Sequence, residues 1–145
     1  MGSRVMIQQR PFTDILTCLK SVGIRPTRQR LALAKLLFDG VDKHITAEAL
    51  HCEARSAKVP VSLATIYNTL NHFTEAGLLR EVVVEAGRSY FDTNVLDHHH
   101  FFFEENSTLQ DFSGDAVTFH GMPEPPNGTK ISRVDVVVRV RKESG

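Results

Sequence analysis

Helix caps and helix breakers alternate through the first half of the chain, and they constrain its fold more than any other feature. Thr27, Thr46 and Ser62 are good N-cap residues, and each precedes apolar residues at helical spacing. Glycine and proline then end these runs, because glycine favours helix C-termini and proline breaks a helix. The pattern predicts four helices, over residues 14–22, 28–39, 47–59 and 63–76.

The fourth predicted helix combines an apolar stripe with a face of hydrogen-bonding side chains. That polar face carries Thr65, Tyr67 and Asn68 rather than the Lys/Glu mixture of a purely solvated surface. Residues 79–92 are β-prone and turn near Gly87, so a hairpin follows the helix. Helices followed by a hairpin are typical of a winged helix, whose last helix enters the DNA major groove. The alternative is a small helical domain with an ordinary polar face.

Arg25, Arg28 and Arg30 cluster at the start of the second predicted helix. The helix macrodipole disfavours positive charge at that end. An external anion such as DNA phosphate would explain the cluster. A solvated run of charge is the alternative.

Three consecutive histidines, His98–His100, precede three phenylalanines in a segment that favours a strand. Alternation along a strand puts His98 and His100 on one face and Asp97 and His99 on the other. Imidazoles two residues apart, with Cα atoms about 6.7 Å apart, can converge on one ion. The run therefore predicts metal or cofactor binding, and a polar strand end is the alternative.

The remaining residues predict strands and a loop. Asp111 and Phe112 lie in the next candidate strand, residues 113–128 are rich in proline and glycine, and residues 133–141 alternate with valine on one face. A domain of about 50 residues with so few strands cannot close its own core. Because unpaired sheet edges also favour association, the second half is predicted to form a homodimer.

Composition narrows the class of protein further. The 145 residues carry 17 Lys+Arg and 17 Asp+Glu, and no apolar stretch is long enough for a transmembrane helix. The N-terminus has no apolar signal core, so the expected location is cytoplasmic, with no membrane partner. Residues 1–86 carry 11 basic and 8 acidic side chains (+3), and residues 87–145 carry 6 and 9 (−3). This asymmetry suits a chain that meets a polyanion with one half and a cation with the other.

Neither cysteine belongs to a Cys-x-x-Cys pair, so both are expected to be reduced, without a disulfide partner.

Four motifs, in order, resemble the ferric uptake regulator superfamily. They are residues 23–30 (GIRPTRQR), 44–48 (HITAE), 62–70 (SLATIYNTL) and the histidine run. The resemblance covers nearly the whole chain and implies an α+β fold. Residues 1–92 would form a winged-helix DNA-binding domain. Residues 93–145 would form a small α/β dimerisation and metal- or haem-sensing domain with an antiparallel sheet.

The resemblance also implies roles for individual residues. His44, Asp92, His98 and His100 match the family's regulatory metal site, which would take iron, manganese or zinc. Asp97, His99 and Asp111 match part of a second metal or haem site, whose fourth position is Val134 here. The implied DNA contacts are Arg25, Arg28, Arg30, Ser62, Thr65, Tyr67 and Asn68. Asn68 stands where many relatives have arginine, which alters the expected base preference.

Two departures from the family pattern point to one branch. Phe103 and Asn106 stand where many relatives have a cysteine pair, so no zinc-thiolate site is expected. The triple histidine and the proline-rich loop resemble the iron response regulators, which report haem availability. The Cys-Pro haem motif of some members is absent, so His98, His99 and His100 become the candidate haem ligands. Because haem iron takes axial ligands above and below the ring, at most one of His98 and His100 is expected to be axial.

The sequence therefore predicts a dimeric iron- or haem-responsive transcriptional regulator of palindromic operator DNA, and not an enzyme. A peroxide- or zinc-sensing regulator of the same superfamily is the nearest alternative, because ligand types alone do not fix the metal. A small metalloenzyme would need an open metal position and a general base, and the sequence offers no evident base. A haem carrier that does not bind DNA is the remaining class.

Overall fold

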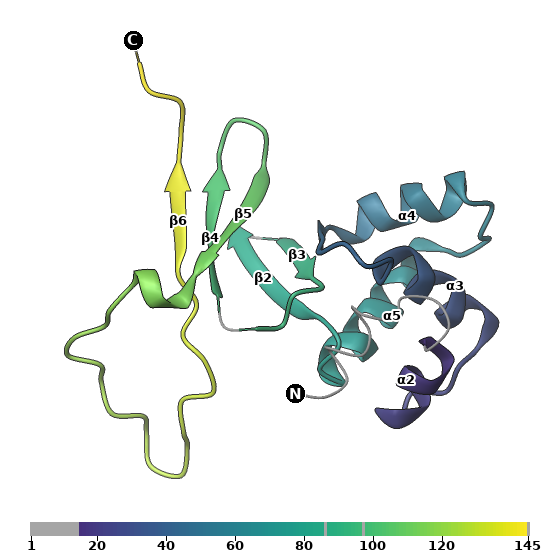
Figure 1. Cartoon of the computed structure of the whole chain (residues 1–145), viewed down its shortest axis with the longest axis horizontal. Coiled ribbons are helices and arrows are strands. Elements are labelled where there is room, and N and C mark those ends of the chain that lie inside the picture. The colour runs from purple at the N-terminus through teal and green to yellow at the C-terminus, as the bar shows by residue number, and fades with distance from the viewer. Residues whose placement is uncertain (1–14, 86, 97, 145) are drawn as a thin grey trace. The chain divides into compact units, whose positions relative to one another are not determined.

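The computed structural model describes residues 15–85, 87–96 and 98–144. The chain divides into two compact units, the first ending at Val95 and the second beginning at Leu96. Each unit has its own three-stranded sheet (Figure 1), which confirms the predicted mixture of helix and sheet. No helix in the described ranges is long and apolar enough to cross a membrane.

Three helices of the first unit begin at the predicted capping side chains. Thr27, Thr46 and Ser62 each accept a hydrogen bond at 3.1–3.2 Å from the backbone N–H three residues later. These bonds satisfy donors that the first turn of a helix leaves without a partner. The helices are α2 (Ile15–Ser21), α3 (Arg28–Leu37), α4 (Ala47–Ser56) and α5 (Leu63–Glu75). Gly77 follows α5 with a φ of +84°, a conformation that favours glycine.

The first sheet has the order β1–β3–β2. Strands β2 (Arg80–Glu85) and β3 (Arg88–Asp92) form the predicted hairpin. The two-residue strand β1 (His44–Ile45), which the sequence pattern did not indicate, pairs antiparallel with β3. This pairing places His44 directly opposite Asp92 in the ladder. Two residues far apart in the unit's sequence are thereby fixed side by side.

The core of the first unit lies between the helices and β3. The apolar stripe predicted for α5 is buried, and Phe73 of that helix packs against Phe38 with ring centroids 6.1 Å apart. Cys18 belongs to the core and Cys52 is exposed, and the two form no disulfide bond. The largest fully buried apolar side chains of this unit are those of Ile15, Leu19, Leu33, Leu37, Leu50, Ile66, Leu70, Phe73 and Phe91.

In the second unit, β4 (His98–Phe103) is the central strand of the sheet, between β5 (Thr108–Ser113) and β6 (Val137–Val140). Strand β5 is antiparallel to β4, but β6 is parallel to it, so the predicted antiparallel sheet is wrong at β6. Strand β5 already returns the chain to the end of the sheet where β4 begins. The proline-rich segment then carries the chain to the other edge of β4, so β6 runs parallel to β4. Within residues 98–144 the helical structure is one short 3-10 turn, η1 (Gly114–Ala116), which also corrects the α/β class predicted for this half.

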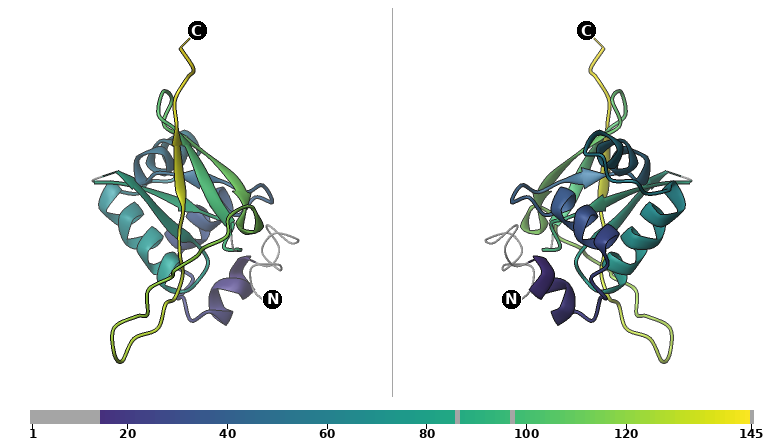
Figure 2. Two further views of the ribbon diagram at one scale, coloured as in Figure 1. Left: turned by 90° about the vertical axis from the view of Figure 1, so that its left-hand side faces the viewer. Right: turned by 90° about the vertical axis from the view of Figure 1, so that its right-hand side faces the viewer.

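Residues 117–136 form the irregular segment between η1 and β6. Figure 2 shows it as a loop that extends beyond the sheet of the second unit. The predicted strand over residues 133–141 forms only from Val137 to Val140. Its first half fails because the Val136 N–H donates to the side chain of His99 rather than to a strand backbone.

Candidate metal ligands and nucleic-acid interface

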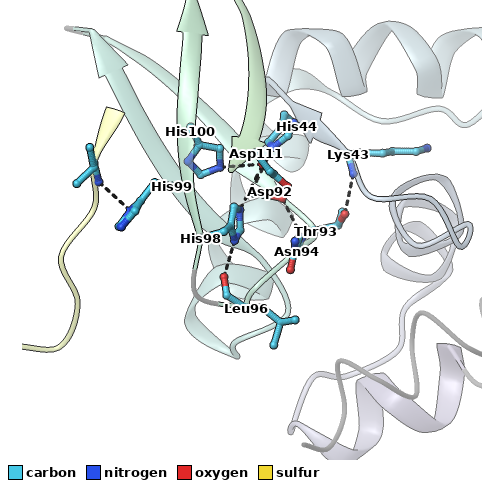
Figure 3. Close-up of polar contacts among 11 residues, drawn as sticks. Lys43, His44, Asp92, Thr93, Asn94, Leu96, His98, His99, His100 and Asp111 are labelled. Atoms are coloured by element: carbon cyan, nitrogen blue, oxygen red, sulfur yellow. Dashed lines mark hydrogen bonds and ion pairs between the residues drawn. The ribbon is translucent and has the colours of Figure 1, made fainter. Parts of the chain in front are cut away.

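His98 is held in the tautomer whose Nε2 can ligate a metal ion. Its Nδ1 contacts the carbonyl oxygen of Leu96 (Figure 3). A carbonyl only accepts, so Nδ1 carries the proton, and in the neutral ring Nε2 then carries the lone pair. That Nε2 lies 3.4 Å from Oδ1 of Asp111. A metal-binding histidine is usually oriented in this way: one ring nitrogen binds the ion, and the N–H of the other ring nitrogen is donated to a group such as a backbone carbonyl.

His100 directs its ring to the same carboxylate. It lies opposite Asp111 in the β4–β5 ladder, so the two side chains share one face of the sheet. Its Nε2 is 3.3 Å from Oδ1 of Asp111, and its ring lies against that of His98 at 4.7 Å between centroids. One Asp111 oxygen thus faces two imidazole nitrogens. The side chain of His100 is almost fully buried.

These three side chains form a cluster that suits a cation. One ligand atom from each lies within 4.8 Å of the other two. Electron-rich atoms at this separation repel one another unless a proton or a metal ion lies between them. Imidazole nitrogen and carboxylate oxygen without thiolate are ligands that iron, manganese and zinc all accept.

The first unit also contains a histidine and an aspartate of the kind that ligate metal ions. Nε2 of His44 lies 3.3 Å from Oδ2 of Asp92, and Oδ1 of Asp92 accepts a 2.8 Å hydrogen bond from the Asn94 N–H. The ends of β1 and β3 are held by Thr93, which accepts from the Lys43 N–H and donates to the Lys43 carbonyl. Because Asp92 is fully buried, its charge needs such compensation.

His99 lies on the opposite face of β4, as the alternation predicts. Its Nδ1 accepts a 3.2 Å hydrogen bond from the Val136 N–H, and its ring packs between Phe112 and Phe119. The neutral ring must then carry its proton on Nε2, so neither nitrogen offers a lone pair to an ion. The predicted second set grouped His99 with Asp111, whereas the structure places Asp111 with His98 and His100. Asp97, the third member of that set, lies outside the described residues.

The polar face of α5 is exposed, as a surface for nucleic acid requires. Tyr67 and Asn68 are exposed, whereas the hydroxyls of Ser62 and Thr65 are engaged in the helix cap. The side chains of Ser62 and Thr65 therefore stabilise the N-terminus of the helix, and those of Tyr67 and Asn68 form the part of this face that a ligand can contact.

The hydroxyl of Tyr67 donates a 2.7 Å hydrogen bond to Oε2 of Glu48, in the first turn of α4. This bond lowers the pKa of Glu48 below its ordinary value of 4.5. The same bond raises the pKa of Tyr67 above its ordinary value of 10.0. At neutral pH the phenol is therefore protonated and the carboxylate charged, so the direction of the hydrogen bond is fixed.

An alkaline titration should detect this bond. The chain has two tyrosines and no tryptophan, so phenolate absorbance reports only Tyr67 and Tyr90. We expect Glu48→Ala to lower the pKa of Tyr67, and Glu53→Ala, on the same helix, to leave it unchanged. Because the bond raises the pKa of Tyr67 and lowers that of Glu48, its stabilisation is present between pH 4.5 and pH 10.0. It is lost as pH rises through the folded pKa of Tyr67 or falls through the folded pKa of Glu48. Identical titrations of parent and Glu48→Ala would contradict the bond.

The predicted arginine cluster lies near α3. Arg25 and Arg28 are exposed. The guanidinium of Arg30 donates to the Arg25 carbonyl at 3.0 Å and lies 3.0 Å from Nδ1 of His72, in α5. Arg30 is thus fixed in orientation, while the other two side chains extend to solvent.

Three features of these sites escaped the sequence analysis: the β1–β3 pairing, the grouping of Asp111 with His98, and the Glu48 contact. The grouping of Asp111 with the histidines could have been predicted from a hairpin between the two strands. A four-residue connection over residues 104–107 puts residue 100 opposite residue 111. Nothing in the sequence pattern indicates the β1–β3 pairing, since β1 is only two residues long.

Comparisons with known proteins agree on one family. Residues 21–136 match the ferric uptake regulator family. The ferric uptake regulation protein of Shigella flexneri is 32% identical over 107 residues, which cover 73% of this chain and 72% of that protein. The peroxide-responsive repressor PerR of Staphylococcus epidermidis is 35% identical over 100 residues, covering 68% of this chain and 65% of that protein.

The fold has solved counterparts as well. A structure of the ferric uptake regulator from Pseudomonas aeruginosa with manganese has a TM-score of 0.67 at 21% identity. The match covers 89% of this chain and 98% of that chain. At this identity the likeness concerns the fold.

Proposed function

Because the chain belongs to the ferric uptake regulator family, whose members are metal-responsive transcriptional regulators, we propose that it is an iron-responsive regulator of operator DNA. In this proposal a divalent cation bound by His44, Asp92, His98, His100 and Asp111 sets its DNA affinity.

Family membership decides between the classes left open by the sequence. Members of the family are transcriptional regulators, not enzymes. The metalloenzyme alternative is therefore dropped. A haem carrier that does not bind DNA is disfavoured by the same membership.

The observation that carries the metal proposal is the arrangement of His98, His100 and Asp111. Two imidazole nitrogens face one carboxylate oxygen at 3.4 and 3.3 Å, and the Leu96 carbonyl fixes the tautomer of His98. A bound cation would be ligated by the carboxylate oxygen and by both ring nitrogens at once. His44 and Asp92, paired in the other unit, would complete the ligand set.

The proposed mechanism couples the two units through the ion. Ligands from both units, bound to one cation, would restrict the orientation of the DNA-binding unit relative to the other. Family regulators are dimeric DNA-binding proteins. As a homodimer, this chain would then hold two α5 helices at the spacing of about 34 Å that successive major grooves require. A coupling of about 1–3 kcal/mol would change DNA affinity about 5–150-fold.

The proposed DNA contacts follow from exposure and charge. Tyr67 and Asn68 of α5 would meet base edges, with Ser62 and Thr65 shaping the start of that helix. Arg25, Arg28 and Arg30 would contact phosphate. A protein that acts on chromosomal operators works in the cytoplasm, and the basic excess of residues 1–86 suits that partner.

The finer assignment to the iron- and haem-responsive branch rests on sequence alone. The triple histidine and the proline-rich loop support it. A peroxide-responsive or zinc-responsive regulator remains the competing assignment, because the donor set accepts iron, manganese and zinc.

We place any regulatory haem on His98 or His100 rather than on His99. The Val136 N–H occupies the lone pair of His99, and a haem-bound histidine needs a free ring nitrogen. Two histidines on one strand face suit a bare ion better than opposite axial positions on haem. Haem bound there would displace the divalent ion and release DNA.

DNA binding with His98→Ala tests the proposal. Fluorescence anisotropy of a two-fold-symmetric duplex would be measured with manganese, zinc, ferrous iron or haem. We expect metal to raise the DNA affinity of the parent about 5–150-fold and to have little effect on His98→Ala. Far-UV circular dichroism should match the parent, because the first unit contains the described α-helices.

His120→Ala is the matched control, since His120 is an exposed histidine of the same unit. It should respond to metal as the parent does. Equal metal-dependent affinity for parent and His98→Ala would overturn the assignment. Haem spectra that change with His99→Ala but not with His98→Ala or His100→Ala would overturn the haem placement.

A further inference from the structure

The contact between Tyr67 and Glu48 joins two helices of the first unit on their exposed side. Tyr67 lies at the fifth position of α5 and is 41% exposed, although α5 buries a full apolar stripe on its other side. Glu48 lies at the second position of α4, just after its capping threonine, and is also exposed. The 2.7 Å hydrogen bond therefore lies at the surface that the proposed function turns toward DNA.

The direction of this hydrogen bond limits what Tyr67 can offer a ligand. A tyrosine hydroxyl has one proton, and here that proton is donated to the Glu48 carboxylate. A hydrogen bond to an ionised acceptor is about twice as strong as a neutral one, so it competes well against a base. What remains on Tyr67 is the acceptor capacity of its oxygen and the apolar edge of its ring.

Base edges in the major groove differ in what they require of such a group. Adenine and cytosine present amino donors, whereas thymine presents the O4 acceptor and a methyl group. Guanine presents only acceptors, N7 and O6. An oxygen that can accept but not donate therefore fits adenine and cytosine, and it repels the lone pairs of guanine N7 and O6 and of thymine O4. The apolar ring edge of Tyr67 can still contact the thymine methyl group.

We propose that Glu48 determines base selectivity by holding the Tyr67 hydroxyl proton, so that the Tyr67 oxygen accepts a hydrogen bond from adenine or cytosine and disfavours guanine. This inference rests on the proposed function, in which α5 lies in the major groove. It assigns to Glu48, which contacts no base in this scheme, a positioning role that acts through Tyr67.

The surroundings of Glu48 keep it ionised for this purpose. It occupies the first turn of a ten-residue helix, where the macrodipole favours negative charge. The hydrogen bond from Tyr67 is the main cause of its lowered pKa, and the charge of Arg88, in β3, acts in the same direction. Glu48, Gly87, Arg88 and Ser89 line one surface pocket, next to the hairpin turn.

The test is a selection with full-length, metal-loaded protein. A two-fold-symmetric duplex library, randomised within each half-site, would be bound by parent, Glu48→Ala, Tyr67→Phe and the double variant. We expect the parent to disfavour guanine at one half-site position by about 5–150-fold, the range of a discriminating base contact. Glu48→Ala should accept guanine there, because the freed hydroxyl can donate to N7 or O6.

The double variant separates this effect from a general change of charge. Tyr67→Phe should lose the preference for adenine and cytosine at that position, and adding Glu48→Ala should change nothing more there. Glu53→Ala, which removes an exposed carboxylate from the same helix, should strengthen binding uniformly and leave base preference intact.

The outcomes distinguish the inference from the proposed function. If Glu48→Ala binds duplex DNA with the base preferences of the parent at every position, the inference is overturned and the proposed function stands. If the metal-loaded parent binds no sequence in the library above its binding to unrelated duplex, the proposed function fails and the inference fails with it.

Discussion

Asp111→Asn is expected to weaken the binding of manganese or zinc by about 100-fold. Loss of an outer-shell partner of a metal ligand costs about 10–100-fold, and Asp111 should stand at the upper end because it would contact the ion itself. Its Oδ1 faces both His98 and His100, so the substitution removes the negative charge at the centre of the cluster. Isothermal titration of the metal-free protein would measure the change.

The shift in thermal unfolding gives a second readout of the same substitution. A ligand at 100 times its dissociation constant stabilises the folded state by about 2.7 kcal/mol. At that metal concentration the parent should gain this stability, and Asp111→Asn should gain little. Asp115→Asn, the same change at an exposed carboxylate nearby, should behave as the parent does. Parent-like metal affinity for Asp111→Asn would remove Asp111 from the proposed ligand set.

Phe73→Ala is expected to lower the free energy of unfolding by about 3–5 kcal/mol. Phe73 is fully buried in α5, and its ring packs against Phe38. Removal of the ring costs its transfer free energy and leaves a cavity in a close-packed core. A domain has only about 5–15 kcal/mol of stability in total, so the melting temperature should fall by more than about 10 °C.

Asn71→Ala is the control for this prediction. Asn71 lies two residues earlier on the same helix and is exposed, so its replacement should change stability by less than about 0.5 kcal/mol. Urea denaturation followed by far-UV circular dichroism reports on the first unit, because the α-helices of the described ranges all lie there. A Phe73→Ala stability within 1 kcal/mol of the parent, about a third of the smallest expected loss, would contradict the packing described.

The helices of this chain were predictable because their ends depend on local chemistry. Thr27, Thr46 and Ser62 cap α3, α4 and α5 with their own side chains, and the apolar stripe of α5 follows from a period within one segment. Such features need no knowledge of the rest of the fold. The alternation that separates His99 from His98 and His100 is local in the same sense.

Features that join distant residues were less accessible to sequence analysis. His44 lies opposite Asp92 only because a two-residue strand pairs with the hairpin, and no local pattern marks so short a strand. The valine alternation of residues 133–141 predicts a longer strand than forms, because the His99 ring takes the Val136 N–H. The Glu48–Tyr67 bond likewise depends on how α4 packs against α5.

The attachment of β6 has a consequence for His99. This strand rejoins the sheet only after the long excursion of residues 117–136, so its docking must offset the entropy of closing that loop. The same hydrogen bond that begins its docking, from Val136, also occupies the imidazole of His99. Local unfolding of this one strand would therefore expose a new ligand nitrogen, and the reactivity of His99 would report how often β6 detaches.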